Sequence, residues 1–121
     1  MPSIHIKTVK LDQVTKNLMA ERLYETYKNV IKMPTIEIFF DEYENYYIQG
    51  KLVDTCNTIT VKLQGHPLSK EEKADLCKSI AEVVKNSVND PSFKMSNFYY
   101  ESPNHDDYGL NGKLLSDLLH H

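Results

Sequence analysis

An internal repeat restricts the architectures that this chain can adopt. The segment from Tyr46 to Leu52 reads YYIQGKL and that from Tyr108 to Leu114 reads YGLNGKL, so four of seven positions are identical. Before each segment the pattern is a strand, an amphipathic helix and a second strand. A helix that carries the chain back across a sheet makes the two strands of a unit parallel. The sequence therefore predicts two βαβ units, about residues 1–55 and 56–121, related by an approximate twofold within one domain.

Hydrophobic periodicity gives the expected elements. Ser69 and Glu72 fit a capping box at the start of the second helix. Each helix carries an apolar stripe that we expect to face a sheet. The expected strands are 3–9, 35–40 (opened by Pro34), 58–63 and 95–100, and the first helix is about 12–32. The apolar stripe of the first helix is Val14, Leu18, Leu23, Tyr27, Val30 and Ile31. The stripe of the second helix is Leu76, Cys77, Ile80, Ala81, Val84 and Val88.

Composition excludes several classes of protein. The net charge is −3 and the lysines are spread along the chain, so we expect no nucleic-acid partner. No apolar run approaches the roughly 20 residues of a membrane span, and the opening residues lack a secretory signal, so we expect no membrane partner and a cytoplasmic location. Cys56 and Cys77 lack metal-ligand spacing, which favours reduced thiols. His120 and His121, either native or the remnant of a purification tag, are left out of the functional argument.

Pro2 is the candidate for chemistry. If Met1 is removed, as a small second residue permits, the nitrogen of Pro2 becomes a secondary amine that can act as a base. A proline elsewhere has its nitrogen locked in an amide. If Met1 is retained, the base is absent. The structural alternative is a proline that begins an edge strand, where its missing N–H does no harm.

Three segments together carry a family resemblance. The opening Met1-Pro2-Ser3-Ile4-His5-Ile6, the glycine-closed segment from Tyr46 to Gly50 and the late segment from Asn97 to Glu101 resemble the tautomerase superfamily, whose members use an amino-terminal proline. The chain also resembles macrophage migration inhibitory factor, 5-carboxymethyl-2-hydroxymuconate isomerase and a small bacterial branch of the same superfamily. The resemblance implies an α+β fold of duplicated βαβ units, a four-stranded sheet with two helices on one face, and a homotrimer.

The resemblance also implies a reaction and a set of site residues. Pro2 would move a proton alpha to the carbonyl of a small keto or enol acid, without cofactor or metal. Its amine must be neutral, so we expect an apolar pocket with nearby cations that lower its pKa. Lys32 and Asn97 are similar to substrate-facing residues of the family, Tyr46 is similar to a pocket aromatic, and Tyr108 is the repeat partner of Tyr46. Structural alternatives are a lysine favoured by a helix dipole at Lys32 and hairpin packing at Tyr46.

The chain departs from the family pattern in its cations. Its single arginine, Arg22, lies inside the first helix, whereas short-chain tautomerases hold a diacid with arginines. Lys7, Lys10 or Lys62 are candidate substitutes, but lysine lacks the planar fork that binds a carboxylate through two bonds. A dicarboxylate substrate is therefore disfavoured. Asn57 stands at the equivalent start of the second unit, so each chain offers one proline site.

Three functional classes stay open at this point. They are a tautomerase or isomerase, a non-enzymatic ligand-binding or interaction protein on the same scaffold, and a ferredoxin-like domain that binds a small ligand. The order of strands separates the ferredoxin-like domain from the other two, because a tautomerase sheet sets its two units side by side and a ferredoxin-like sheet interleaves them. The first residue of the mature protein separates the remaining two classes.

Overall fold

The computed structural model describes residues 2–33 and 35–119, so the expectations about Met1, Pro34, His120 and His121 lie outside the described residues. The elements, in chain order, are β1 (Ser3–Val9), α1 (Gln13–Ile31), β2 (Glu37–Tyr43), β3 (Tyr46–Ile48), β4 (Lys51–Val53), β5 (Thr58–Gln64), α2 (Lys70–Ser87), β6 (Met95–Glu101), β7 (Gly109–Leu110), β8 (Lys113–Leu114) and α3 (Leu115–Leu119).

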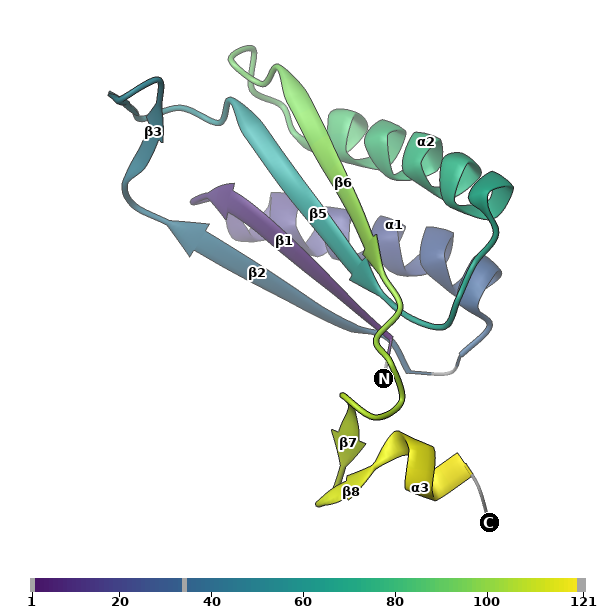
Figure 1. Ribbon diagram of the computed structural model, residues 1–121. Helices are drawn as coiled ribbons and strands as arrows, with labels where there is room; N and C mark the ends of the chain where they lie inside the picture. The colour runs from purple at the N-terminus through teal and green to yellow at the C-terminus, as the bar shows by residue number, and fades with distance from the viewer. Residues whose placement is uncertain (1, 34, 120–121) are drawn as a thin grey trace.

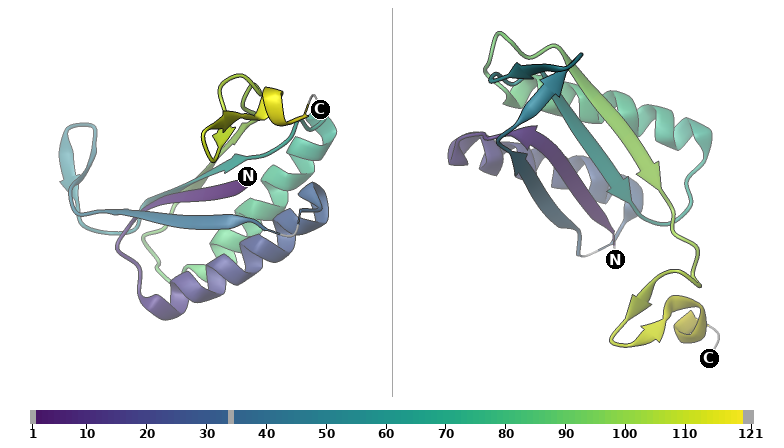
Figure 2. Two further views of the ribbon diagram at one scale, coloured as in Figure 1. Left: turned by 90° about the horizontal axis from the view of Figure 1, so that it is seen from below. Right: turned by 60° about the vertical axis from the view of Figure 1, so that its left-hand side comes forward.

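Four strands form one mixed sheet in the order β2-β1-β5-β6. Each βαβ unit contributes a parallel pair, β1 with β2 and β5 with β6. The two units meet where β1 runs antiparallel to β5, with Ser3 opposite Gln64. Helices α1 and α2 cover the same face of the sheet (Figures 1 and 2). The predicted α+β fold is confirmed, and the side-by-side units are inconsistent with the interleaved order of a ferredoxin-like sheet.

The repeated segments form matching hairpins. β3 pairs with β4 and β7 pairs with β8, both antiparallel. The two turn residues have positive φ in each hairpin, 51° and 78° at Gln49 and Gly50, and 51° and 83° at Asn111 and Gly112. This is the pattern of a type I′ turn, which matches the twist of the flanking strands. The hairpins project from opposite ends of the sheet, as the twofold predicts (Figures 1 and 2).

The helices begin where the sequence predicts. The Asp12 side chain accepts a hydrogen bond from the Thr15 backbone N–H at 2.7 Å. The capping box is complete, with Ser69 Oγ accepting from Glu72 N at 3.1 Å and Glu72 Oε1 accepting from Ser69 N at 2.9 Å. Helix α1 ends at Ile31 and is capped by Lys32, whose φ is 53°.

The core lies between the helices and the covered face of the sheet. Three stripe positions were wrong: Val14 is 77% exposed, and Cys77 and Ala81 are also exposed. Cys77 and Ala81 each follow a buried residue, and adjacent helical residues point about 100° apart, so only one of each pair can face the sheet. The buried apolar residues are Ile4, Ile6, Met19, Leu23, Tyr27, Ile31, Cys56, Ile59, Val61, Leu63, Leu76, Ile80 and Val84.

The second strand differs most from the prediction, while β5 and β6 each end one residue later than expected. The second strand begins at Glu37 rather than at residue 35, and it ends at Tyr43 rather than at Phe40. Its length is set by pairing with all seven residues of β1, from Ser3 opposite Glu37 to Val9 opposite Tyr43. The backbone pairing therefore extends through polar residues that the hydrophobic pattern left out.

The remaining general expectations concern thiols and membranes. Cys56 is buried and Cys77 is exposed, and both are free thiols. Over the described ranges, no helix has the length and apolarity needed to cross a membrane.

Candidate functional site

A pocket of about 140 Å³ lies at the end of the sheet where β1 begins. Pro2 lines this pocket and is buried, and its carbonyl accepts a hydrogen bond from Glu37 N at 3.2 Å. The pocket that we expected beside Pro2 is therefore present. Its lining residues are Pro2, Met33, Gln64, Gly65, His66, Ser102, Pro103, His105, Tyr108 and Leu115.

Two tyrosine hydroxyl groups hold the segment that forms one side of the pocket, residues 64–66. The hydroxyl of Tyr27 donates to the Gln64 carbonyl at 2.8 Å, and that of Tyr100 donates to the His66 carbonyl. Gly65 N donates to Glu101 O at 3.1 Å. Burial raises the pKa of Tyr27 and, in the same way, that of Tyr100. Both hydroxyl groups therefore stay protonated and remain hydrogen-bond donors at neutral pH.

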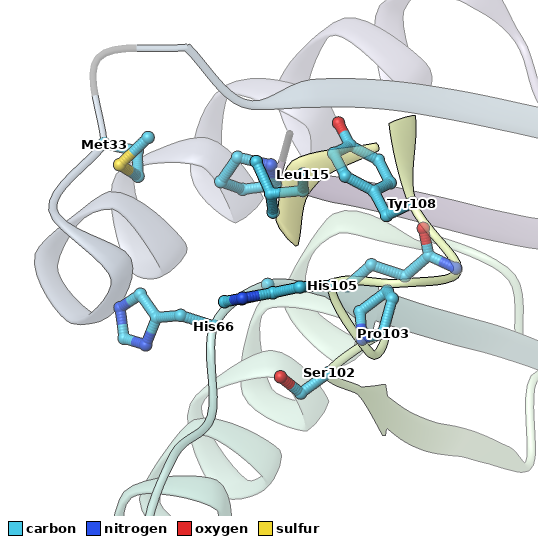
Figure 3. Close-up of a pocket in the computed structure, with 10 residues that line it drawn as sticks. Met33, His66, Ser102, Pro103, His105, Tyr108 and Leu115 are labelled. Atoms are coloured by element: carbon cyan, nitrogen blue, oxygen red, sulfur yellow. The ribbon is translucent and has the colours of Figure 1, made fainter. Parts of the chain in front are cut away.

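The C-terminal segment closes another side of the pocket. The backbone N–H of Leu115 donates to Tyr108 O at 2.7 Å, and the N–H of Ser116 donates to His105 O at 3.0 Å. These bonds fasten the loop that carries His105 and Tyr108 to the first residues of α3. Figure 3 shows His66 and His105 along one side of the pocket, with Met33 and Leu115 on the other.

The structure brings together Pro2 and Tyr108 among the predicted site residues, because both line the pocket. Lys32 lies outside it, in a neighbouring hollow that also contains Glu72. The pKa of Glu72 is lowered chiefly by its hydrogen bond to the Ser69 backbone, with smaller contributions from the charges of His66 and Lys32. His66 borders both hollows.

The other two predicted residues lie away from Pro2 in a single chain. Tyr46 belongs to the hairpin at the opposite end of the sheet, where its ring packs on that of Tyr43 at a centroid distance of 5.1 Å. Asn97 pairs with Thr60 in the parallel register of β6 and β5, and its Nδ2 donates to Thr60 Oγ1 at 3.4 Å. Neither side chain lines the pocket at Pro2.

The two histidines of the pocket were missed as site residues. His66 follows the end of β5, and β5 is antiparallel to β1, so the end of one strand meets the start of the other. That antiparallel pairing is a signal that could have placed His66 near Pro2. His105 lies in a loop after β6. Its position depends on backbone hydrogen bonds to α3, and no local sequence pattern predicts these bonds.

The pocket has an unusual charge composition for the expected reaction. Among the described residues that line it there is no lysine, arginine, aspartate or glutamate. The expected lysine or arginine partner for Pro2 is thus not supplied by the same chain's pocket. The described residues also contain no cluster of three or more histidine, cysteine, aspartate or glutamate side chains that could hold a metal ion.

Comparison with solved structures identifies the fold, whereas comparison of the sequence does not. No family model matches the sequence, and no curated protein matches it. Among solved structures, the F6 fused 4-OT wild-type asymmetric trimer is similar with a TM-score of 0.80 at 15% identity, covering 96% of this chain and 98% of that one. The fold is that of a fused 4-OT chain. The predicted resemblance to the tautomerase superfamily is confirmed at the level of the fold.

Two other solved structures, with lower TM-scores, share the tautomerase fold. Macrophage migration inhibitory factor from Toxoplasma gondii has a TM-score of 0.72 at 4% identity, covering 93% of this chain and 98% of that one. MIF2 from Leishmania major has a TM-score of 0.68 at 17% identity, covering 94% and 97%. These two structures cover 93% and 94% of this chain, so the tautomerase fold accounts for nearly the whole chain.

Proposed function

We propose that this chain is a cofactor-independent tautomerase or isomerase that moves a proton on a small keto acid, with Pro2 as the acid and base. The observation that carries the proposal is the burial of Pro2 against a pocket with apolar and hydrogen-bonding side chains. The reaction requires removal of Met1, which converts the Pro2 nitrogen from an amide to an amine. We propose in addition that the protein acts in the cytoplasm.

The chemistry follows from the two kinds of lining residue. The amine of Pro2 would take a proton from the carbon alpha to the substrate carbonyl, which leaves an enolate, and the protonated amine would return that proton to the enolate oxygen to give the enol, or by the reverse steps convert the enol to the keto acid, so the amine is unchanged after each cycle. Met33, Pro103 and Leu115 provide apolar surface near the amine. Desolvation disfavours a charged amine, so this surface would keep more of it in the neutral, basic form.

We also propose that three copies form a homotrimer. Two of the similar structures are described as trimers of fused 4-OT. The uncovered face of the sheet exposes large apolar side chains, with Phe39 43% exposed, Met95 53% and Tyr99 58%. Tyr46 and Asn97 stay predictions for this assembly, since within one chain they are remote from Pro2.

The test combines mass spectrometry with a keto–enol assay. Intact mass gives the first residue, and ultraviolet absorbance follows the enol of phenylpyruvate. We expect Met1-free protein to accelerate ketonisation and Pro2→Ala to lower kcat/KM strongly. Pro91→Ala is the matched control, because Pro91 is exposed in the turn before β6 and its nitrogen is an amide. Met1-free wild-type protein without activity on phenylpyruvate or 2-hydroxymuconate would refute the proposal.

A non-enzymatic binding protein on the same scaffold is the second candidate. The observation that favours it is the pocket lining, which within the described chain has no lysine or arginine to lower the pKa of a terminal amine. Protein from cells that retains Met1 in full would support this candidate, because the pocket would then have no base.

A further inference from the structure

We propose that His66 and His105 form the carboxylate-binding element of the Pro2 pocket and make it selective for a monoanionic acid. This inference rests on the proposed function in its choice of ligand class. It assigns a role to two side chains that the family resemblance did not single out, and it takes that role away from Lys32.

The composition of the pocket is the first argument. His66 and His105 are the only side chains among the described lining residues that can carry a positive charge. An imidazole carries one ring N–H when neutral and two when protonated. His66 Nδ1 lies 3.0 Å from the Pro67 carbonyl, so His66 offers a carboxylate its Nε2–H, which it carries together with the Nδ1–H when the ring is protonated. No acidic side chain belongs to the described lining of the pocket itself, and the acidic neighbour of His66 is Glu72 in the adjoining hollow.

The position of the two rings is the second argument. Figure 3 shows both imidazoles on the same side of the pocket, across from Met33 and Leu115. A small acid would place its carboxylate on the histidines and its apolar body on the other side. Two neighbouring donors suit one carboxylate, and the described lining supplies no second cationic group for a second carboxylate.

The backbone around each histidine is the third argument. The His66 carbonyl is held by the hydroxyl of Tyr100, and the His105 carbonyl is held by the N–H of Ser116 at 3.0 Å. The backbone of His105 lies within a tight turn in which Asp106 N donates to Asn104 Oδ1 at 2.9 Å. Both side chains are exposed, so these bonds fix the backbone position of each histidine beside the pocket rather than the orientation of its ring.

Lys32 cannot take the same role in this chain. It lies in the neighbouring hollow with Glu72 and Asp75, and the segment that carries His66 borders both hollows. Lys32 does not line the pocket at Pro2, whereas His66 lines both hollows, so of these two groups only His66 can reach a carboxylate bound beside Pro2. The structure therefore assigns anion recognition to the histidines.

The test measures binding without turnover. The probes are 3-phenylpropanoate and its neutral amide, 3-phenylpropanamide, titrated into the full chain and followed by calorimetry or NMR. We expect wild type to prefer the acid, and His66→Gln and His105→Gln each to lower affinity for the acid about tenfold while leaving the amide unchanged. His5→Gln is the matched control, because His5 stacks on Phe39 on the sheet and does not line the pocket.

Two outcomes would overturn the inference. One is a wild-type protein with no preference for the acid, and the other is a pair of folded histidine variants that keep the wild-type preference. Circular dichroism and thermal melting establish that each variant is folded. Binding of the acid through the histidines without keto–enol activity would support this inference and refute the proposed reaction, so the two failures are distinguishable.

Discussion

Replacement of Gly65 by alanine should destabilise the protein and displace the segment that carries His66. A Cβ at this position would lie 2.7 Å from Ile31 Cδ1 and 2.8 Å from the Tyr100 hydroxyl, and still closer to the hydroxyl of Tyr27. These neighbours are buried or half-buried and are packed against the core, so they have little room to move. Glycine is required here because three side chains, those of Tyr27, Ile31 and Tyr100, approach the position of a Cβ closely.

The magnitude has two parts. Overpacking a well-packed site costs about 1–3 kcal/mol. Moving the tyrosines weakens the bonds from Tyr27 to Gln64 O and from Tyr100 to His66 O, at about 1 kcal/mol for each. We expect Gly65→Ala to lower the free energy of unfolding by about 3–5 kcal/mol and Tm by roughly 15 °C.

Urea unfolding followed by circular dichroism measures this loss, and a double-mutant cycle identifies its cause. Tyr27→Phe removes the atom nearest to the new methyl group, so Gly65→Ala should cost about 1 kcal/mol less in that background. Gly50→Ala is the control, because Gly50 has φ of 78° with no atom within 4 Å of a Cβ. Its cost comes from backbone strain and should not change with Tyr27→Phe. Wild-type stability for Gly65→Ala, or equal cost in both backgrounds, would show that the steric reasoning is wrong.

Three further predictions concern the capping box and the lysine. Ser69→Ala should lower the free energy of unfolding by about 1 kcal/mol in urea, and an unchanged midpoint would contradict the role of the cap. The pKa of Glu72 is lowered in the folded state, so its contribution is complete above its unfolded pKa and is lost as pH falls through the folded one. Between about pH 5 and pH 3 the melting temperature of Glu72→Gln should therefore fall less than that of wild type, and parallel curves would argue against this linkage. Lys32→Ala should bind 3-phenylpropanoate like wild type, and a loss as large as that of His66→Gln would mean that the pocket extends to Lys32.

Local sequence signals were sufficient wherever a few neighbouring residues decide the structure. The capping box at Ser69, the cap at Asp12 and the two glycine-closed hairpins are formed by side chains within a few positions of the backbone they affect. The repeat then predicted the arrangement of the units, because the same pattern stabilises the same βαβ unit twice. The errors at Val14 and Cys77 arose because periodicity gives the direction of a helix face only approximately.

The sequence by itself determined the duplicated fold, the helix starts, the hairpins and the choice of Pro2 as the residue to test. Only the tertiary structure decided which side chains surround Pro2, since His66, His105 and Tyr108 are 64, 103 and 106 positions away from it in the chain. Their approach depends on the antiparallel pairing of β1 with β5 and on the fastening of the C-terminal loop to α3. Contacts between residues so distant in sequence are set by packing and strand register. Packing and register depend on the whole chain, so no local sequence pattern predicts these contacts.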